Sequence, residues 1–295
     1  MNKVEHKRLA MVAEDEWLEP VEAEVELRHA MYLTRLEDIE RNGSIVDYAN
    51  GYRYFGWQYD EDMSGWWFRE WLPAAHDVYI FGDFNNWQRT QLRLGKDSNG
   101  VWSIFLPDAM YGARLVDGSL YKLHIHGNNG WRDRIPAYAK RVVQDEATKN
   151  YTAQFVIEKP YDWKHDDFRA PKVGELLIYE AHVGMATEKE GVGTYAEFRD
   201  DILPRIKEAG YNAVQLMAIA EHPYYGSFGY HVANFFAPSS RFGTPEELKS
   251  LVRKAHKLGI AVIMDIVTEA GATLLQGYHF DRPLSPDEFY HKYVK

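Results

Sequence analysis

The sequence predicts a multidomain fold, in which an all-β immunoglobulin-like sandwich is followed by an incomplete α/β (β/α)8 barrel of the TIM type. Between about residues 54 and 156, short alternating strands are divided by turn residues, which is the pattern of a sandwich. Beyond residue 174, apolar strands of the buried type alternate with a helical pattern, which is the order of βα units. This last part of the chain is about half as long as the roughly 250 residues of a closed barrel.

Residues 1–45 are predicted to form a helical lead. From residue 17 to residue 39, apolar side chains recur among charged ones at helical spacing. We expect one amphipathic helix there that packs on the next domain. The apolar positions are Val25, Ala30, Met31, Leu33 and Leu36.

Residues 46–158 are predicted to form the sandwich. The clearest strands cover residues 66–71, 77–81, 100–106 and 119–125. Turn-forming residues at 85–86, 97–100 and 127–130 separate them. A charged stretch with several prolines, residues 159–173, is predicted to be a linker.

Residues 174–270 are predicted to form the first βα units of the barrel. Apolar runs at 175–184, 211–219 and 260–267 are typical of buried parallel strands. A capping box from Thr194 to Glu197 predicts the start of the first helix. A second capping box begins at Thr244, with a proline at the first helical position and apolar residues at helical spacing up to residue 258.

The segment of residues 224–243, which we call the aromatic loop, organises this part of the chain. It contains seven aromatic residues and three glycines, so the pattern favours an irregular loop that presents flat apolar faces, on which sugar rings stack. In barrels of βα units, the loops that follow the strands build the active site. Aromatic clusters more often serve packing, so a buried core role for Tyr230 and its neighbours stays the alternative.

Composition excludes several classes of protein. A formal net charge of -10 argues against a nucleic-acid partner, since such binding needs a basic surface. The absence of cysteine excludes disulfides, thiolate metal sites and cysteine nucleophiles. No apolar stretch has the length of a membrane span, and no signal peptide is recognised, so we expect a soluble cytoplasmic protein with no membrane partner, no metal and no cofactor.

Residues 225–248 resemble the corresponding stretch of 1,4-α-glucan (glycogen) branching enzymes, which are members of glycoside hydrolase family 13. Those enzymes cut an α-1,4 glucan chain and rejoin it through an α-1,6 bond. The resemblance implies that Tyr230 stacks on the sugar beside the cleaved bond. It also implies that Asp265 is the aspartate of the first signature region of the family and, like Tyr230, a substrate-binding residue.

The predicted sandwich resembles the family-48 carbohydrate-binding module through residues 82–87, Tyr121, Lys122, Gly127 and Trp131. In glycogen-binding relatives, two tryptophans stack on glucose and a lysine donates a hydrogen bond. The resemblance therefore implies that Trp87, Trp131 and Lys122 bind α-glucan. The alternative is that Trp87 only closes the core of the sandwich.

No catalytic residue is predicted. A retaining glycosidase needs two carboxyl groups about 5 Å apart, and the signature regions that would carry them are not recognised. His182, at the end of the first barrel strand, is interpreted as an orienting hydrogen-bond partner rather than as a catalytic group. We do not expect the acids after Asp265 to replace the missing pair; these are Glu269, Asp281, Asp287 and Glu288.

The chain departs from the branching-enzyme pattern at residues 268–271, and residues 271–295 resemble the C-terminal end of an EAL domain. That short tail implies no phosphodiesterase activity. We therefore expect a chain related to branching enzymes that does not catalyse by itself, with a C-terminal barrel half as a possible missing partner. Two alternatives stay open: a non-catalytic protein that binds α-glucan such as glycogen, and a truncated or fused fragment without function.

Overall fold

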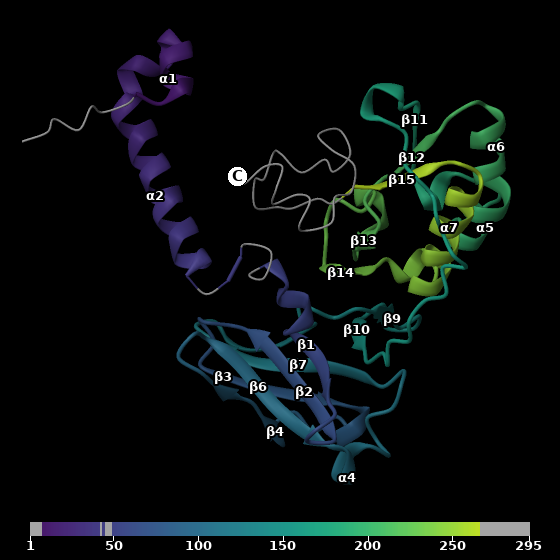
Figure 1. Cartoon of the computed structure of the whole chain (residues 1–295). Coiled ribbons are helices and arrows are strands. Elements are labelled where there is room, and N and C mark those ends of the chain that lie inside the picture. Colours follow the sequence, from purple (N-terminus) through teal and green to yellow (C-terminus); the bar gives the residue numbers. More distant parts are fainter. Residues whose placement is uncertain (1–7, 42, 45–48, 266–295) are drawn as a thin grey trace, which may run out of the picture. The chain divides into compact units, whose positions relative to one another are not determined.

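The computed structural model describes residues 8–41, 43–44 and 49–265, which divide between a unit ending at Gly51 and a second unit that begins at Tyr52 (Figure 1). The first unit contains α1 (Ala10–Glu14), η1 (Glu16–Val21) and α2 (Glu22–Glu40). The predicted helix is confirmed over α2, but it does not begin at Trp17. Pro20 disfavours α-helical geometry at the residue before it, and residues 16–21 form a 3-10 helix instead.

The sandwich consists of two antiparallel sheets, and each predicted strand is present to within one or two residues. One sheet has the order β1-β2-β6-β5, and the other has the order β4-β3-β7-β10-β9 with β8 paired to β7. The strands are β1 (Gly56–Asp60), β2 (Gly65–Trp71), β3 (Asp77–Gly82), β4 (Leu92–Arg93), β5 (Gly95–Lys96), β6 (Val101–Pro107), β7 (Leu120–Gly127), β8 (Gly130–Arg134), β9 (Val142–Gln144) and β10 (Tyr151–Gln154). The short helical turn η2 (Gly51–Arg53) precedes β1, and η3 (Asp83–Asn85) and α4 (Asp108–Tyr111) lie in the connections between strands.

Alternate residues of these strands point between the two sheets and form the core. Trp57 lies at its centre, with ring centroids 5.0 to 6.0 Å from those of Phe68, Phe84, Tyr121 and Phe155. Edge-to-face packing of this kind adds to the free energy gained by burying apolar surface. The aromatic residues that point inward therefore form the core, whereas the outward-facing ones on the same strands remain accessible to ligands.

Beyond the sandwich, three parallel strands form a sheet in the order β11-β12-β15. The elements are η4 (Val173–Glu175), β11 (Ile178–Ala181), η5 (Val183–Met185), α5 (Tyr195–Glu197), η6 (Phe198–Ile202), α6 (Leu203–Glu208), β12 (Ala213–Leu216), α7 (Pro245–Lys257) and β15 (Ala261–Met264). Both predicted capping boxes are confirmed, at Thr194 and at Thr244. The turn η6 is a π-helix just before Pro204, which has no N–H to continue the ladder.

Helices cover one face of the parallel sheet. Ala181, Val214 and Leu216 pack against the buried residues of α5, α6 and α7, which Figure 1 draws on one side of the strands. On the opposite face, Glu180 is exposed and Gln215 is half-buried. Residues 155–172 contain no helix or strand, as the predicted linker requires, but Phe168 and Ala170 of this stretch pack on Ala213, Ala261 and Ile263.

The aromatic loop is more regular than predicted. Before it lies β13 (Ala220–Glu221), and within it are η7 (Tyr225–Ser227), β14 (Asn234–Pro238) and η8 (Ser240–Phe242); β13 pairs with β14 in an antiparallel ribbon. The buried carboxylate of Glu221 accepts hydrogen bonds from Ser239 and Ser240, which draws the far end of the loop back to its start. Such long-range side-chain bonds leave no periodic trace in the sequence. Residues 271–295, the predicted EAL-like tail, lie outside the described residues.

Candidate functional site

Tyr230 and Asp265 lie together at the carboxyl end of the parallel sheet. Asp265 directly follows β15, and its backbone N–H donates to the carbonyl of Leu216 at 3.1 Å. The Tyr230 hydroxyl donates to Asp265 Oδ2 at 3.2 Å. The two residues that the sequence assigned to sugar binding are therefore brought into contact, although 35 positions separate them.

A tight turn presents Tyr230. Phe228 and Gly229 both have positive φ, 55° and 90°. A Cβ atom at position 229 would lie 1.9 Å from the carbonyl oxygen of Ala218, so only glycine fits. The turn leaves the Tyr230 side chain 37% exposed, which contradicts a role in the packed core. Partial burial, followed by the charge and hydrogen bond of Asp265, raises the pKa of Tyr230, so the phenol stays protonated and donates.

Glu180 is a further carboxylate near Tyr230 that the sequence analysis did not select. Its negative charge also raises the pKa of Tyr230, and its Oε1 accepts a hydrogen bond from Gln215 Nε2 at 3.1 Å. Glu180 is in register with Gln215 and, through it, with Ile263, two residues before Asp265. Strand spacings of about 4.8 Å and a rise of about 3.3 Å per residue put the Cα atoms of Glu180 and Asp265 roughly 12 Å apart. Glu180 therefore lies on β11 and Asp265 directly follows β15, the two outer strands of the described sheet.

His182 has a packing role rather than the predicted hydrogen-bonding one. Within the described part of the chain, neither ring nitrogen has a hydrogen-bond partner. The rings of Tyr225, Phe228 and Phe242 surround it at centroid distances of 5.5 to 5.7 Å, at steep angles. These rings occupy the space where a polar partner would lie. Desolvation, followed by the charge of His222, lowers the pKa of His182, which favours the neutral imidazole.

Trp131 lies on the outer face of the sandwich, on a platform of two histidines. Its ring is stacked on His124 at 4.5 Å and 9° and on His126 at 4.8 Å and 20°. These histidines are two residues apart on β7, which pairs with β8 in the register His126 to Trp131. The Trp131 side chain is 40% exposed, and stacking on the two histidines fixes the orientation of its ring.

Trp87 and Lys122 are close to this platform. The ring of Phe81 lies 5.6 Å from that of Trp87 and 6.3 Å from that of His124. Because Trp131 is stacked on His124, these contacts connect Trp87 to Trp131. Lys122 is paired with Phe81 and precedes His124 by two positions, so it belongs to the same face of the sheet. Trp87 is 37% exposed and donates from Nε1 to Asp83 Oδ1 at 2.8 Å, which rules out a role that only closes the core.

A polar network supports the platform. Asp133 accepts hydrogen bonds from His124 at 2.7 Å and from Arg89 at 2.9 and 3.1 Å. Burial alone would raise the pKa of Asp133, but the hydrogen bonds from Arg89 and His124 outweigh it and lower the pKa. The sequence analysis missed His124, His126, Asp133 and Arg89. The alternation of residues 122, 124 and 126 along the predicted strand was a signal for the two histidines.

Two further properties hold for the described residues. No group of three histidine, cysteine or acidic side chains among them could hold a metal ion. In the same ranges, no helix is both long enough and apolar enough to cross a membrane.

Two family models match the chain. Residues 54–139 match Carbohydrate-binding module 48 (Isoamylase N-terminal domain), and residues 185–291 match Alpha amylase, catalytic domain. The first match contains Trp87, Trp131 and Lys122, and the second contains Tyr230 and Asp265. In class, the chain is similar to a carbohydrate-binding module of the sandwich type followed by part of an α-amylase catalytic domain. The second match also includes most of residues 271–295, where the resemblance to an EAL domain stays a prediction.

The chain is similar to 1,4-α-glucan-branching enzymes. It is 44% identical to that of Dictyostelium discoideum over 272 residues, which are 90% of this chain and 40% of the relative. It is 44% identical to the branching enzyme 2-2 of Arabidopsis thaliana over 86% of this chain and 32% of that protein, and 42% identical to the enzyme of Aspergillus oryzae over 89% and 39%. The chain thus spans between about a third and two fifths of the length of these curated relatives.

Solved structures agree on the fold. A putative α-amylase from Salmonella typhimurium matches 72% of this chain and 33% of its own, with a TM-score of 0.59 at 20% identity. A pullulanase from Group B Streptococcus, solved with maltotetraose, matches the same shares with a TM-score of 0.56 at 23% identity. These likenesses extend over both the sandwich and the parallel sheet, because neither part alone accounts for 72% of the chain.

Proposed function

We propose that these 295 residues supply the α-glucan-binding part of a 1,4-α-glucan branching enzyme, and that they do not transfer glycosyl groups on their own. The reaction of such an enzyme moves a glucan segment from an α-1,4 to an α-1,6 linkage, as in glycogen metabolism. One observation carries the proposal. Two separate surfaces present half-exposed aromatic rings with polar groups beside them: Trp87 and Trp131 on the sandwich, and Tyr230 at the parallel sheet.

Each surface has the chemistry that α-glucan recognition requires. Sugar rings offer apolar C–H faces for stacking and hydroxyl groups for hydrogen bonding. On the sandwich, Lys122 lies on the same face of the sheet as Trp131 and can donate hydrogen bonds to sugar hydroxyl groups. At the sheet, Tyr230 and Asp265 combine a ring with a carboxylate that can accept from hydroxyl groups.

Affinity electrophoresis in gels with and without glycogen tests the binding. We expect the wild-type protein to be retarded by glycogen, and the double variant Trp87→Ala with Trp131→Ala to lose most of that retardation. Trp71→Ala is the matched control, because Trp71 is an exposed tryptophan on the other sheet of the sandwich. Equal retardation of the wild type and the double variant would count against the assignment of this surface.

An assay for new α-1,6 branch points in amylose tests the second half of the proposal. We expect no branching by the purified chain, because the signature regions that carry the two carboxyl groups of a retaining enzyme are not recognised in its sequence. Branching above the level of a Tyr230→Ala, Asp265→Ala control would refute this. A second protein that supplies the rest of the barrel, added in trans, is expected to restore turnover.

A specific observation favours each of the two alternative functions. A purely non-catalytic glycogen-binding protein is favoured by the Trp131 platform, and it predicts retardation by glycogen that Tyr230→Ala leaves unchanged. A non-functional fragment is favoured by the exposed apolar side chains of Ile178 and Tyr179 on β11, an outer strand of the described sheet, and it predicts aggregation rather than cooperative unfolding of a monomer. The incomplete barrel, the EAL-like tail and the cytoplasmic location stay predictions within this proposal.

A further inference from the structure

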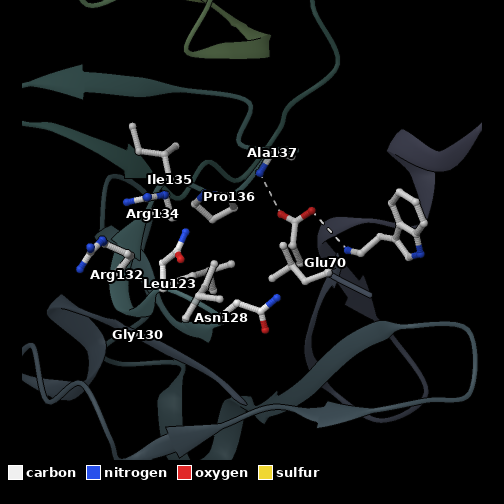
Figure 2. A pocket seen from close by; sticks show the side chains of 14 residues that line it. Glu70, Leu123, Asn128, Gly130, Arg132, Arg134, Ile135, Pro136 and Ala137 are labelled. Carbon is white, nitrogen blue, oxygen red and sulfur yellow. Dashed lines mark hydrogen bonds between the residues drawn. The ribbon is translucent and has the colours of Figure 1, made fainter. Parts of the chain in front are cut away.

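The stretch that joins β8 to β9 of the sandwich, residues 136–138, is held from two sides; we call it the connecting segment. On one side lies Glu70 of β2, which is 2% exposed and points into the sandwich. Its Oε2 accepts a hydrogen bond from the backbone N–H of Ala137 at 2.9 Å, and its Oε1 accepts one from the N–H of Trp71 at 3.3 Å. Figure 2 shows the carboxylate between these two donors.

Packing does not explain a carboxylate at this position. Glu70 lines a cavity of about 440 Å³ whose wall is mainly apolar, including Leu72, Leu123 and Ile125. Burial raises the pKa of Glu70 to about 7, so the charged form is unfavourable there. An apolar residue would fill the place at lower cost, but it could not accept the N–H of Ala137. The role of the Glu70 carboxylate is therefore to accept the hydrogen bond from the connecting segment.

On the other side of the connecting segment lies Asn234, the first residue of β14, which is also 2% exposed. Its Nδ2 donates to the carbonyl oxygens of Pro136 at 2.9 Å and Ala137 at 3.2 Å. Its Oδ1 accepts from the N–H groups of Phe236 and Ala237, both at 2.9 Å. All four hydrogen-bonding positions of the amide are used, two toward the sandwich and two toward the aromatic loop.

Three more contacts tie the aromatic loop to the sandwich. The ring of Tyr138 is stacked on that of Phe236, with centroids 4.5 Å apart. At the start of the loop, Tyr151 of β10 donates from its hydroxyl to the carbonyl of His222 at 3.2 Å. Arg241, at the far end, donates to the Tyr151 hydroxyl at 2.9 Å. Residues 223–233, which carry Tyr230, are therefore attached at both ends to the sandwich.

We propose that the sandwich positions the aromatic loop for sugar binding, and that Asn234 and Glu70 are the positioning residues, since they hold the same peptide units of the connecting segment from opposite sides. The module thus has a second function besides its own tryptophan surface: it is the support on which Tyr230 is presented. The inference rests on the proposed role of Tyr230 in glucan binding, but the positioning of the aromatic loop by Asn234 and Glu70 can be measured without any sugar.

Hydrogen exchange followed by mass spectrometry tests whether Asn234 and Glu70 hold the aromatic loop in place. Asn234→Ala is expected to raise the exchange rate of amides in residues 224–236 by at least about fivefold, the effect of losing one net hydrogen bond. Glu70→Ala is expected to raise exchange in the same loop, and Glu70→Gln to restore part of the protection, because its amide oxygen still accepts the N–H of Ala137. If Glu70 is only a structural residue of the sandwich, exchange rises around residues 70 and 137 but stays unchanged at 224–236, and the proposal is wrong.

Maltoheptaose binding, measured by calorimetry, tests whether the positioning of the loop affects its affinity for glucan. The Trp87→Ala, Trp131→Ala background leaves only the loop surface to bind. In this background, Asn234→Ala is expected to weaken affinity at least about fivefold, whereas Asn99→Ala, at an exposed asparagine of a turn, leaves it unchanged. If the Trp87→Ala, Trp131→Ala protein does not bind maltoheptaose, the proposed role of Tyr230 in glucan binding is wrong. The hydrogen-exchange result still decides whether Asn234 and Glu70 position the aromatic loop.

A milder variant covers the case in which Asn234→Ala does not fold. Tyr151→Phe removes only the hydroxyl that bonds His222 and Arg241, and it keeps the ring. We expect it to raise exchange in residues 222–233 while the strands of the sandwich stay protected. Unchanged exchange in both Tyr151→Phe and Glu70→Ala overturns the inference.

Discussion

Replacing Glu70 by glutamine is expected to remove a pH dependence of folding. Burial raises the pKa of Glu70 from its ordinary value of 4.5 to about 7, although hydrogen bonds from the N–H groups of Ala137, Trp71 and Tyr138 act in the opposite direction. Between these two pH values, the folded protein binds more protons at Glu70 than the unfolded chain does. The free energy of unfolding therefore falls as pH rises through this window.

The magnitude follows from the size of the shift. The rise of the Glu70 pKa from 4.5 to about 7, at about 1.4 kcal/mol per tenfold change, corresponds to about 3.5 kcal/mol, most of which is lost between pH 5 and pH 8. The neighbouring Tyr121 stays neutral over this range because burial raises its pKa. The difference between the wild type and Glu70→Gln isolates the contribution of this one side chain.

Urea unfolding at pH 5 and pH 8 measures this effect as a difference between proteins. Relative to Glu70→Gln, the wild type is expected to lose about 2 to 3 kcal/mol of unfolding free energy over that range. Glu61→Gln, at an exposed glutamate in a turn of the same sandwich, is expected to follow the wild type. If the wild type and Glu70→Gln change in parallel from pH 5 to pH 8, the burial argument for Glu70 is wrong.

Three further substitutions test other parts of the account. Gly229→Ala puts a Cβ atom 1.9 Å from the carbonyl oxygen of Ala218 at a φ of 90°, so we expect a stability loss above about 2 kcal/mol in urea and loss of glucan binding by the loop; near-normal values contradict the turn geometry. Thr244→Ala removes the capping box of α7 and is expected to cost about 1 kcal/mol in the same assay, whereas Ser98→Ala, in a turn, should cost far less. Tyr230→Phe keeps the ring and loses the hydrogen bond to Asp265, so calorimetry with maltoheptaose should show only a few-fold weaker binding, and Tyr230→Ala a much larger loss; equal effects would argue against stacking.

The features that could be predicted from the sequence are those that depend on neighbouring residues. The capping boxes at Thr194 and Thr244 were predictable because donor and acceptor lie three positions apart. The strands of the sandwich were predictable because inward and outward residues alternate, as in β7, where Tyr121 and Leu123 are buried. Tyr230 and Asp265 were identified only by family resemblance, since their contact joins a loop to a strand 35 positions later.

The features that escaped prediction depend on contacts between distant parts of the chain. The ribbon of β13 and β14 is fixed by the buried side chains of Glu221 and Asn234, whose partners lie up to 98 positions away. The Trp131 platform depends on the register that pairs β7 with β8, and a shift of one residue would put His124 and His126 on the other face. The hydrogen-bonding role expected for His182 failed because three aromatic rings from the loop fill its surroundings.

Glycogen affinity electrophoresis of the Trp87→Ala, Trp131→Ala, Tyr230→Ala triple variant beside the wild type is the most direct measurement. The account predicts that glycogen slows the wild type and leaves the triple variant at the mobility it has in a gel without glycogen. A wild type that glycogen does not slow, or a folded triple variant that is slowed as much as the wild type, contradicts it.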